Sequence, residues 1–409
     1  MLSQNSIVSP LLGIFNDSFP PVMDGVSVAT KNYAYWLQKK TGHACVITPR
    51  CPESTDNESY PIYRYSSFPI PFRKPYRYGI PYVDRGFINR MYQLPFKLVH
   101  AHCPFSSGTV AMKIAQRQGI LIVATFHSKY RSDFERIIPN KFVVDLIIKN
   151  IMKFYEMADE VWIPQAEVEE TIREYGFKGH VEVVDNGSDL YVDETKPVLR
   201  QQARRDLGIS QDENVFIFVG QHIWEKNTAF LIKTLENLGD FPFKMFFIGT
   251  GYAAKEMKMM VNNRHLSDKV TFVGQVVDSQ LLTQYYAASD LFLFPSMYDN
   301  APLVVREAAA LQTPSLLLKN STSSGIIRDG FNGYLSYDLP EYFATSIKNI
   351  VRRKKRMQEV GYIASRTIVR PWNDIIDEVI DRYSNIISRK NHLCIKFNAN
   401  SISCLFNHG

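Results

Sequence analysis

The stretch "DLFLFPSMYDNAPLVVREAAALQTPSLLL", residues 290–318, decides the fold class. It begins with a short apolar run, continues through a polar loop into an alanine-rich segment typical of a helix, and ends in a second apolar run. Short apolar runs that alternate with helices are typical of buried parallel strands. Pro302 in the first turn of the predicted helix agrees with this, because that position needs no N–H donor. The stretch therefore predicts a strand, a helix and a parallel strand.

The same alternation recurs along the chain. Apolar runs typical of buried strands occupy residues 11–15, 44–48, 97–102, 121–127, 160–164, 215–220, 244–249, 269–274, 290–295 and 314–318. Helical stretches lie between them, for example residues 28–42, where Gly42 supplies the stop signal. We therefore expect an α/β protein whose two halves are both doubly wound.

The polar, proline-containing stretch 191–200 is predicted to be a linker. It separates a first domain, residues 1–190, from a second, residues 191–370. A final segment, residues 371–390, is expected to form an amphipathic helix that ends near residue 388. No role is assigned to residues 391–409. Ligands of open α/β sheets bind outside the carboxyl ends of the strands, so the two domains should face each other across a cleft.

Composition excludes several classes of protein. The 409 residues are 45% hydrophobic and 22% charged, as in an ordinary globular protein. The net charge of +6 is too small to indicate nucleic-acid binding by itself, although it suits anionic ligands or an anionic membrane surface. The five cysteines lack metal-ligand spacing, which predicts reduced thiols in a cytosolic setting. There is no recognisable export signal and no apolar run of about 18 residues, so we expect a chain that does not span a membrane.

Two residues of the first half are candidates for a binding site. Gly25 lies at the N-terminus of a predicted helix, where a glycine lets backbone N–H groups approach a phosphate. The alternative is that Gly25 is a simple turn residue. His127 closes a strand at the predicted cleft and could donate a hydrogen bond to a sugar, or be structural. His100 and His102 share one face of a strand, but no third ligand accompanies them, so no metal site is predicted.

The second half offers a cation and two acids. Lys226 follows the first strand of this half and could neutralise a diphosphate, or be a plain exposed lysine. Asp299 and Glu307 are eight residues apart and could hold hydroxyls at both ends of a nucleotide sugar. The N–H groups of Leu303 and Val304 would then meet its phosphates. The alternative is a helix N-cap aspartate and a solvated glutamate.

Two basic segments are ambiguous. The run "RRKKR", residues 352–356, is expected to be a solvated helix face, with contact to an anionic membrane as the alternative. The loop 68–82 interleaves aromatic residues with Arg73, Lys74 and Arg77, and could touch lipid headgroups or an acceptor.

Taken together, these segments resemble glycosyltransferase family 4, over residues 10–388. The motifs that carry the resemblance, in order, are "DSFPPVMDGV", "GHACVITP", "LVHAHCP", "ATFHSKY", "VVDNGSD", "FVGQHIWEKN", "FFIGTG", "VTFVGQV", "LFLFPSMYDNAPLVVREAAALQTPSLL" and "IRDGFNGYL". Within the family, "GVSVATKNYAYWL", "YRYGIPY" and "YDNAPLVVREAA" look most like the diacylglycerol glucosyltransferases and related lipid or polysaccharide enzymes.

The resemblance implies a GT-B fold, in which two Rossmann-like domains face each other across a cleft and the C-terminal helix returns to the N-terminal domain. The N-terminal domain would bind the acceptor and the C-terminal domain the nucleotide sugar. The implied activity is retaining transfer of a hexose from a nucleotide diphosphate sugar, expected to be a UDP-sugar, to a lipid or glycan hydroxyl. No cofactor or metal is implied, and the protein would be cytoplasmic or peripheral on the inner face of the membrane.

The resemblance also assigns residues. His127, Lys226 and Asp299 would act on the transferred sugar and the leaving diphosphate. The donor would be bound by Gly25, Gly220, Gln221, Lys226, Asn300, Leu303, Val304 and Glu307. Retention in this family is ascribed to attack from the face of the departing phosphate, so no nucleophile is named.

Three residues depart from the family pattern. Gln221 stands where a diphosphate-binding arginine is usual, Asp299 replaces a glutamate, and Asp24 replaces one glycine of a pair. The missing arginine matters most, because it removes a charge-assisted bond to the phosphates. Two alternative functions remain. A nucleotide-sugar 2-epimerase resembles this fold and also releases a nucleoside diphosphate, and a catalytically weak nucleotide-sugar-binding partner is suggested by Gln221 and by the unmatched tail.

Overall fold

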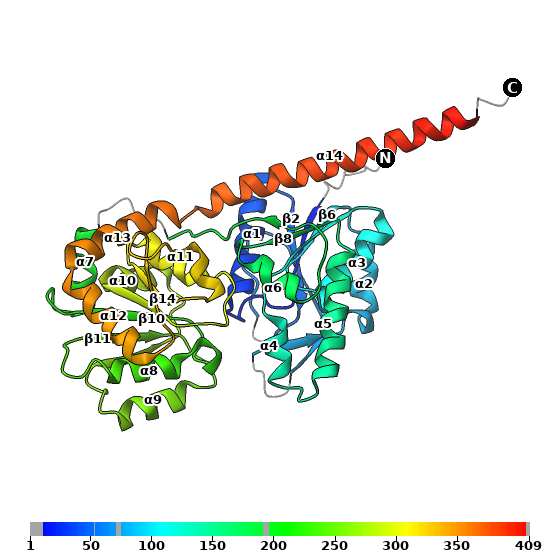
Figure 1. Cartoon of the computed structure of the whole chain (residues 1–409). Helices are drawn as coiled ribbons and strands as arrows, with labels where there is room; N and C mark the ends of the chain where they lie inside the picture. Colours follow the sequence, from blue (N-terminus) through cyan, green and yellow to red (C-terminus); the bar gives the residue numbers. More distant parts are fainter. Residues whose placement is uncertain (1–10, 53, 71–74, 191–195, 406–409) are drawn as a thin grey trace.

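The computed structural model describes residues 11–52, 54–70, 75–190 and 196–405, and only the backbone of 391–405. Its described residues form two lobes of parallel sheet covered by helices, joined along the top of Figure 1 by the long C-terminal helix. The predicted α/β class is confirmed.

The N-terminal domain is built on a seven-stranded sheet of order β3-β2-β1-β6-β7-β8-β9, in which every described pairing is parallel. Its strands are β1 Leu11–Phe15, β2 Ala44–Pro49, β3 Ile62–Tyr65, β6 Phe96–Ala101, β7 Leu121–Thr125, β8 Glu160–Ile163 and β9 Glu182–Val183. The helices that cover it are α1 Gly25–Thr41, α2 Arg85–Gln93, α3 Ser106–Gln118, α4 Tyr130–Glu135, α5 Lys141–Glu156 and α6 Val168–Glu174.

The C-terminal domain repeats the plan with a six-stranded parallel sheet of order β12-β11-β10-β13-β14-β15. Its strands are β10 Val215–Val219, β11 Lys244–Ile248, β12 Val270–Gly274, β13 Leu291–Phe294, β14 Ser315–Leu318 and β15 Tyr334–Ser336. Its helices are α7 Lys196–Asp206, α8 Thr228–Glu236, α9 Ala254–Asn263, α10 Ser279–Ala288, α11 Leu303–Ala310, α12 Pro340–Arg352 and α13 Lys354–Thr367.

All ten predicted strands are present. Strands β3, β9 and β15 were missed, because they are short and only partly buried and so lack the continuous apolar run that identifies a central strand. The first five residues of the predicted linker lie outside the described residues, and its remainder is already part of α7, which begins at Lys196.

The first helix shows how the local sequence sets its ends. Asp24 is the N-cap of α1, and its carboxylate accepts a hydrogen bond of 2.8 Å from the backbone N–H of Ser27. Gly42 ends the helix with φ 72°, a left-handed conformation that glycine adopts without steric cost. The buried face carries Tyr33 and Leu37, which pack toward the sheet.

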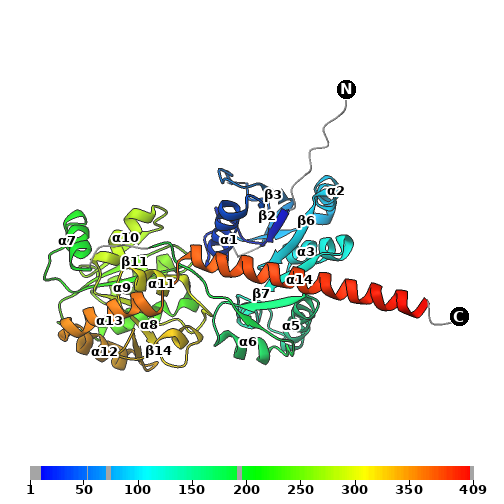
Figure 2. The same cartoon turned by 90° about the horizontal axis from the view of Figure 1, so that it is seen from above.

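The last helix, α14, spans Trp372–Leu405, so the predicted end near residue 388 is wrong. Its apolar face packs against α1 and joins the N-terminal core through Trp372, Ile375, Ile376, Val379 and Tyr383. Figure 2 shows this helix running across the N-terminal domain after leaving the C-terminal one. The prediction was too short because residues 391–405 show no apolar periodicity from which a helix could be recognised.

Two further segments refine the sequence analysis. The stretch 68–82 is not an open loop: β4 Ser67–Pro69 and β5 Arg77–Gly79 pair in an antiparallel hairpin, and a 3₁₀ turn follows at Pro81–Val83. Arg73 and Lys74, two of the cations in the segment that could touch lipid headgroups or an acceptor, lie outside the described residues. The basic run 352–356 is exposed as predicted, but it spans the junction between α12 and α13.

Candidate functional site

The predicted site residues of the C-terminal domain lie at the carboxyl edge of its sheet. Gly220 and Gln221 follow β10, and the loop that contains Asp299 follows β13. Strands β10 and β13 are neighbours, and the strand order reverses between them, so these two segments flank the switch point where open α/β sheets bind ligands. The backbone is tight here: a Cβ on Gly249 at the end of β11 would lie 2.0 Å from the Gly220 carbonyl oxygen, so only glycine fits.

Lys226 and Asp299 form an ion pair at this edge. Lys226 belongs to the 3₁₀ turn Trp224–Lys226 after β10, and both side chains are largely buried. The other carboxylate oxygen of Asp299 accepts a hydrogen bond of 2.5 Å from the Ser296 hydroxyl. The alternative of an N-cap aspartate does not hold, because Pro302 is the N-cap residue of α11. Asp299 therefore faces the lysine rather than the helix end.

The loop after β13 also contacts the N-terminal domain. The Asn300 amide donates a hydrogen bond of 2.9 Å to the backbone carbonyl of His127. The Lys129 ammonium donates one of 2.9 Å to the Met297 carbonyl, and the Tyr298 hydroxyl donates to the Asp133 carboxylate at 3.0 Å. The strand ends that carry the predicted residues of the two domains therefore meet directly.

His127 lies two residues beyond the end of β7, and its ring is part of a row of three imidazoles. Its Nε2 lies 3.0 Å from Nδ1 of His102, whose ring stacks on that of His100 at 4.3 Å. Burial lowers the pKa of His127 to about 3, and the pKa values of His100 and His102 are well below their usual range for the same reason. The three rings are therefore neutral at pH 7. Among the described residues, no group of three or more acids, histidines or cysteines could hold a metal ion.

Glu307 lies one turn into α11, and one of its oxygens accepts a hydrogen bond of 3.0 Å from the Tyr286 hydroxyl. Burial raises the pKa of this carboxyl group, while the bond from Tyr286 lowers it by less. Leu303 and Val304 form the first turn of α11, whose N–H groups have no partner within the helix and can serve an anion. Within the described residues, Glu307 takes part in no ion pair, so its carboxylate keeps capacity for a ligand hydroxyl.

Two of the three departures from the family pattern meet at one tyrosine. The Gln221 amide donates a hydrogen bond of 3.2 Å to the hydroxyl of Tyr76, which also hydrogen-bonds to the carboxylate of Asp24. Asp24 caps α1 and its pKa is raised by burial. Gly25 is exposed, with open space where a Cβ would be, and its approach to a phosphate stays a prediction. Asp24, Tyr76 and Gln221 form a hydrogen-bonded bridge between the domains.

The sequence analysis did not single out Tyr76 or Lys129. Tyr76 is 145 residues from Gln221, and nothing in a single sequence indicates that such distant positions touch. Lys129 could have been noticed, because it is two residues beyond His127 in the motif "ATFHSKY". Burial lowers the pKa of Lys129, while nearby Asp299 raises it by less.

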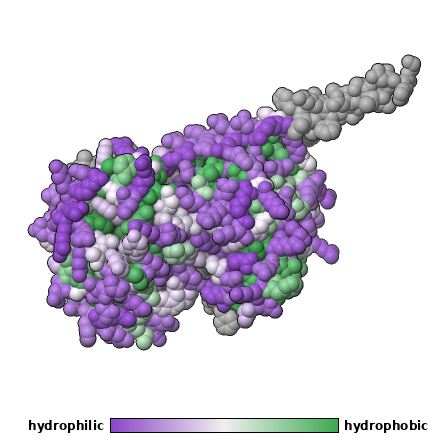
Figure 3. All heavy atoms as spheres, viewed as in Figure 1, coloured by the Kyte–Doolittle hydropathy of each residue, from purple (hydrophilic) through white to green (hydrophobic). Residues whose placement is uncertain are grey.

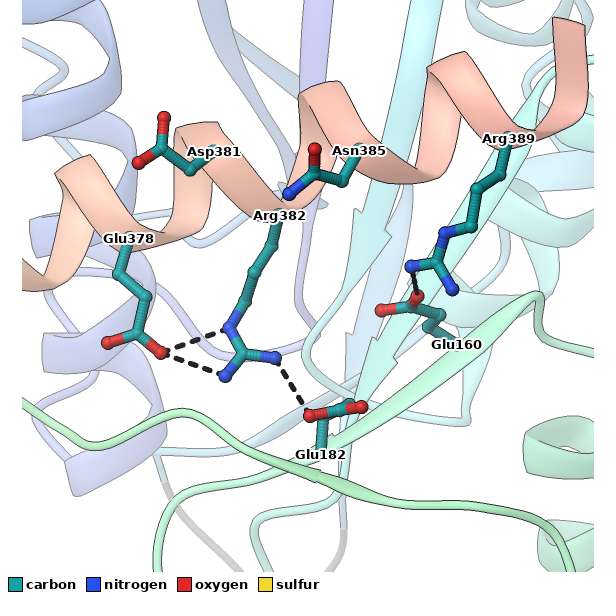
Figure 4. A pocket seen from close by; sticks show the side chains of 7 residues that line it. All are labelled: Glu160, Glu182, Glu378, Asp381, Arg382, Asn385 and Arg389. Atoms are coloured by element: carbon teal, nitrogen blue, oxygen red, sulfur yellow. Dashed lines mark hydrogen bonds and ion pairs between the residues drawn. The ribbon is translucent and has the colours of Figure 1, made fainter. Parts of the chain in front are cut away.

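A separate hollow of about 520 Å³ lies between α14 and the edge strands of the N-terminal sheet. Its lining is charged, as Figure 4 shows: Arg382 joins Glu378 and Glu182, and Arg389 pairs with Glu160. Glu160 and Glu182 are the first residues of β8 and β9, so this hollow lies at the amino edge of the sheet. Ligands of such sheets bind at the opposite edge, and these ion pairs instead attach α14 to the domain.

Comparison with known families agrees with this geometry. A family described as "Glycosyltransferase Family 4" matches residues 23–191, and one described as "Glycosyl transferases group 1" matches residues 200–367. The two matches follow one another and together span most of the chain, with one on each domain. The chain belongs to glycosyltransferase family 4. It is a glycosyltransferase with the GT-B fold, as the resemblance implied.

Two curated relatives carry the name alpha-monoglucosyldiacylglycerol synthase. The protein of Streptococcus pneumoniae is 25% identical over 339 residues, which cover 80% of this chain and 75% of the relative. That of Acholeplasma laidlawii is 24% identical over 340 residues, covering 79% and 83%. A teichuronic acid biosynthesis glycosyltransferase of Bacillus subtilis, TuaC, named as putative, is 26% identical over 268 residues, or 64% of each chain.

Solved structures show the same fold at low identity. A sucrose-phosphate synthase from Thermosynechococcus elongatus superposes with a TM-score of 0.80 at 18% identity, over 93% of this chain and 100% of that one. HepE of Anabaena, solved with UDP and glucose, gives a TM-score of 0.75 at 15% identity, over 92% and 100%.

Proposed function

We propose that this glycosyltransferase moves a hexose from a UDP-sugar to a hydroxyl of a lipid or glycan acceptor, with retention, in the synthesis of a cell-envelope glycolipid or polysaccharide. The observation that carries the proposal is the hydrogen bond from the Asn300 amide to the His127 carbonyl. This bond brings His127, which the proposal assigns to the sugar, against the loop of the other domain, next to the Lys226–Asp299 ion pair. A sugar held there would lie between both sets of groups.

The donor side of the proposal rests on charge. Lys226 supplies a cation for the leaving diphosphate, and the first turn of α11 supplies N–H groups at Leu303 and Val304. Glu307 would accept hydrogen bonds from the ribose hydroxyls, and Asp299 from those of the sugar. The complex of HepE with UDP and glucose supports a UDP-sugar as donor. The activated sugar enters as a co-substrate, and the proposal includes no cofactor.

Retention is supported by the name of two relatives, which specifies an alpha product. In a nucleoside diphosphate glucose the bond from the sugar to the phosphate is also alpha, so an alpha product keeps the configuration. In such a reaction the acceptor hydroxyl would attack from the face that the diphosphate leaves, and Lys226 would stabilise the departing charge. His127 is neutral and would act on the sugar as a hydrogen-bonding group.

The acceptor side is supported by the same relatives, whose names include diacylglycerol. An exposed apolar surface lies beside the domain junction, at the N-terminal end of α5, and Figure 3 shows hydrophobic residues over this part of the domain. Its members are Ile137, Phe142, Val143 and Leu146, which we call the α5 surface. Phe142 is 76% exposed, and a phenylalanine this exposed within an apolar patch indicates a surface that contacts something other than water.

Cations surround the α5 surface. Lys141, Lys149 and Lys153 are exposed along the same helix, and Asp145 on this helix is paired with Arg131 at 2.7 Å. Apolar side chains flanked by lysines are suited to the boundary of an anionic bilayer. Among the described residues, no helix combines the length and the hydrophobicity that crossing a membrane requires. We therefore propose peripheral contact, from the cytoplasmic side, through the α5 surface.

The proposal is tested by incubating the purified protein with UDP- and GDP-hexoses, with and without diacylglycerol, and measuring nucleotide release and lipid-linked sugar. We expect release of UDP that depends on the acceptor, together with a glycolipid of unchanged anomeric configuration. Release of UDP with a free rearranged sugar and no acceptor would instead identify an epimerase. A donor that raises the melting temperature but is never consumed would identify a binding partner.

A further inference from the structure

The row of three imidazoles extends from the core of the N-terminal domain to the domain junction. His100 is on β6, His102 follows that strand, and His127 follows β7 beside it. His100 and His102 are 0% and 1% exposed. The ring of His102 lies between the other two: it stacks on His100, with centroids 4.3 Å apart, and lies nearly parallel to the ring of His127, with centroids 5.2 Å apart. The donor-side contact of Asn300 uses only the backbone of His127, so it does not orient the imidazole.

His100 is fixed at both nitrogens. Its Nδ1 lies 2.6 Å from the hydroxyl of Tyr383 on α14, and its Nε2 lies 2.7 Å from the hydroxyl of Thr125. Both partners can donate or accept, so His100 is satisfied as either tautomer. It therefore acts as a rigid support on which the ring of His102 stacks.

A single proton joins His102 and His127. Their facing nitrogens, Nδ1 of His102 and Nε2 of His127, are 3.0 Å apart, a hydrogen-bond distance. Both rings are neutral because burial disfavours the charged form, so one nitrogen carries the hydrogen and the other accepts it. The tautomer of one ring thus determines the tautomer of the other.

The second nitrogen of His102 decides which ring donates. His102 Nε2 is buried and has no hydrogen-bond partner among the described residues. A hydrogen on this atom would be a buried N–H without an acceptor, and such orphaned N–H groups are rarer in folded proteins than under-satisfied acceptors. The hydrogen of His102 is therefore on Nδ1, which donates to Nε2 of His127. His127 then carries its own hydrogen on Nδ1.

We propose that His102 is a positioning residue that holds His127 as the Nδ1–H tautomer, so that His127 offers a hydrogen-bond donor, and not a base, to the bound sugar. That His127 donates to a bound sugar rests on the proposed function, whereas the tautomer of His127 does not. The Nε2 lone pair of His127 is already used by His102, so it is not available to take a proton from the acceptor hydroxyl. The acceptor must lose its proton to another group.

The tautomer can be measured without substrate. In protein labelled with ¹⁵N-histidine, two-bond ¹H–¹⁵N spectra distinguish Nδ1–H from Nε2–H rings, and the spectrum of His127→Gln assigns the His127 signals. We expect the ligand-free protein to show His127 protonated at Nδ1. In His102→Asp a carboxylate oxygen, which can accept but cannot donate, replaces the Nδ1–H donor, so we expect Nε2 of His127 to carry a hydrogen. His127 protonated at Nε2 in the unaltered chain, or an unchanged spectrum in His102→Asp, would overturn the proposal.

A conservative variant provides rescue. In His102→Asn the side-chain amide can place an N–H donor near the position of Nδ1, so we expect the Nδ1–H form of His127 to be retained. With donor and acceptor present, we expect kcat to fall about tenfold in His102→Asp, the scale of one hydrogen bond, and to be retained in His102→Asn. Equal loss in both variants would show that His102 only fills space. A correct tautomer in a chain that transfers no sugar would contradict the proposed function alone.

Discussion

The ammonium of Lys226 is paired with the carboxylate of Asp299, across two loops that follow neighbouring strands of the C-terminal sheet. An incoming diphosphate would compete with Asp299 for the same cation. The pair therefore keeps a lysine in a largely buried position before the donor arrives, since an unpaired buried ammonium would be costly.

Replacing this cation should affect the reaction more than the fold. We expect Lys226→Ala to lower kcat at least about 100-fold, the scale of one lost group that stabilises developing charge. The free energy of unfolding should change by only about 1 kcal/mol, because Asp299 keeps its bond from Ser296 and still interacts with the nearby Lys129 ammonium. Steady-state kinetics and urea unfolding measure the two effects, and exposed Lys233 on α8 provides the control Lys233→Ala. Comparable loss of stability and activity would make Lys226 a structural residue.

The bridge through Tyr76 makes a prediction about the missing arginine. Gln221→Arg should raise affinity for UDP about tenfold, because a cation would be added where the family binds the diphosphate. Tyr76→Phe removes the hydrogen-bond partner of Gln221 without adding charge, so we expect a smaller increase in UDP affinity than in Gln221→Arg. Isothermal titration with UDP compares the variants. If Gln221→Arg binds no tighter than the unaltered chain, position 221 does not reach the phosphates.

Glu307 can be tested while its contact with Tyr286 is preserved. Glu307→Gln keeps an oxygen that can accept from the Tyr286 hydroxyl but removes the charge, so we expect stability to change by less than about 1 kcal/mol. Affinity for UDP should fall about tenfold, the difference between a charged and a neutral acceptor for the ribose hydroxyls. Free uracil lacks the ribose, and its weaker binding should not change. Unaltered UDP affinity would contradict the assignment of Glu307 to the ribose.

The buried histidines make stability depend on pH. His100 stays neutral in the folded protein because burial places its pKa well below the usual value of 6.5, whereas the unfolded chain takes up a proton near that value. The unfolded state therefore binds more protons below about pH 6.5, and folding stability is lost as pH falls through this range. We expect the slope of unfolding free energy against pH, between 5 and 6.5, to decrease by about 1 kcal/mol per pH unit in His100→Gln.

The α5 surface predicts binding to anionic bilayers. Phe142→Ser combined with Leu146→Ser should reduce co-sedimentation with vesicles of phosphatidylcholine and phosphatidylglycerol at least about tenfold, because two apolar side chains no longer enter the boundary. Val277→Ser removes a comparably exposed apolar side chain from the other domain and should have no effect. Binding that persists in the double variant would place the membrane contact elsewhere on the chain.

Much of the fold follows from local patterns. The central strands are continuous apolar runs such as residues 215–220, because helices cover both faces of a parallel sheet. Strand β9 is two residues long and could not be distinguished from a loop. The end of α14 could not be predicted either, since its final residues show no hydrophobic period.

The site was predictable only in part. Residues that follow strands, such as Lys226 and Asp299, could be assigned to one edge from the order of the sheet. The partners that define their environment come from distant parts of the chain: Tyr76 for Gln221, and Tyr286 for Glu307. Such contacts depend on how the loops and helices pack, which no short motif records. The pairing of His102 with His127 likewise needed the positions of two adjacent strands.

The contact between Tyr383 and His100 has a consequence for biosynthesis. Tyr383 belongs to a helix that follows the whole C-terminal domain in chain order, yet it completes a polar network in the middle of the N-terminal domain. While the ribosome is still translating the second half, that network lacks one of its members. The first domain to emerge would therefore be the last to mature, and a ribosome stalled before codon 383 would hold a nascent chain whose N-terminal domain is more sensitive to protease than the finished one.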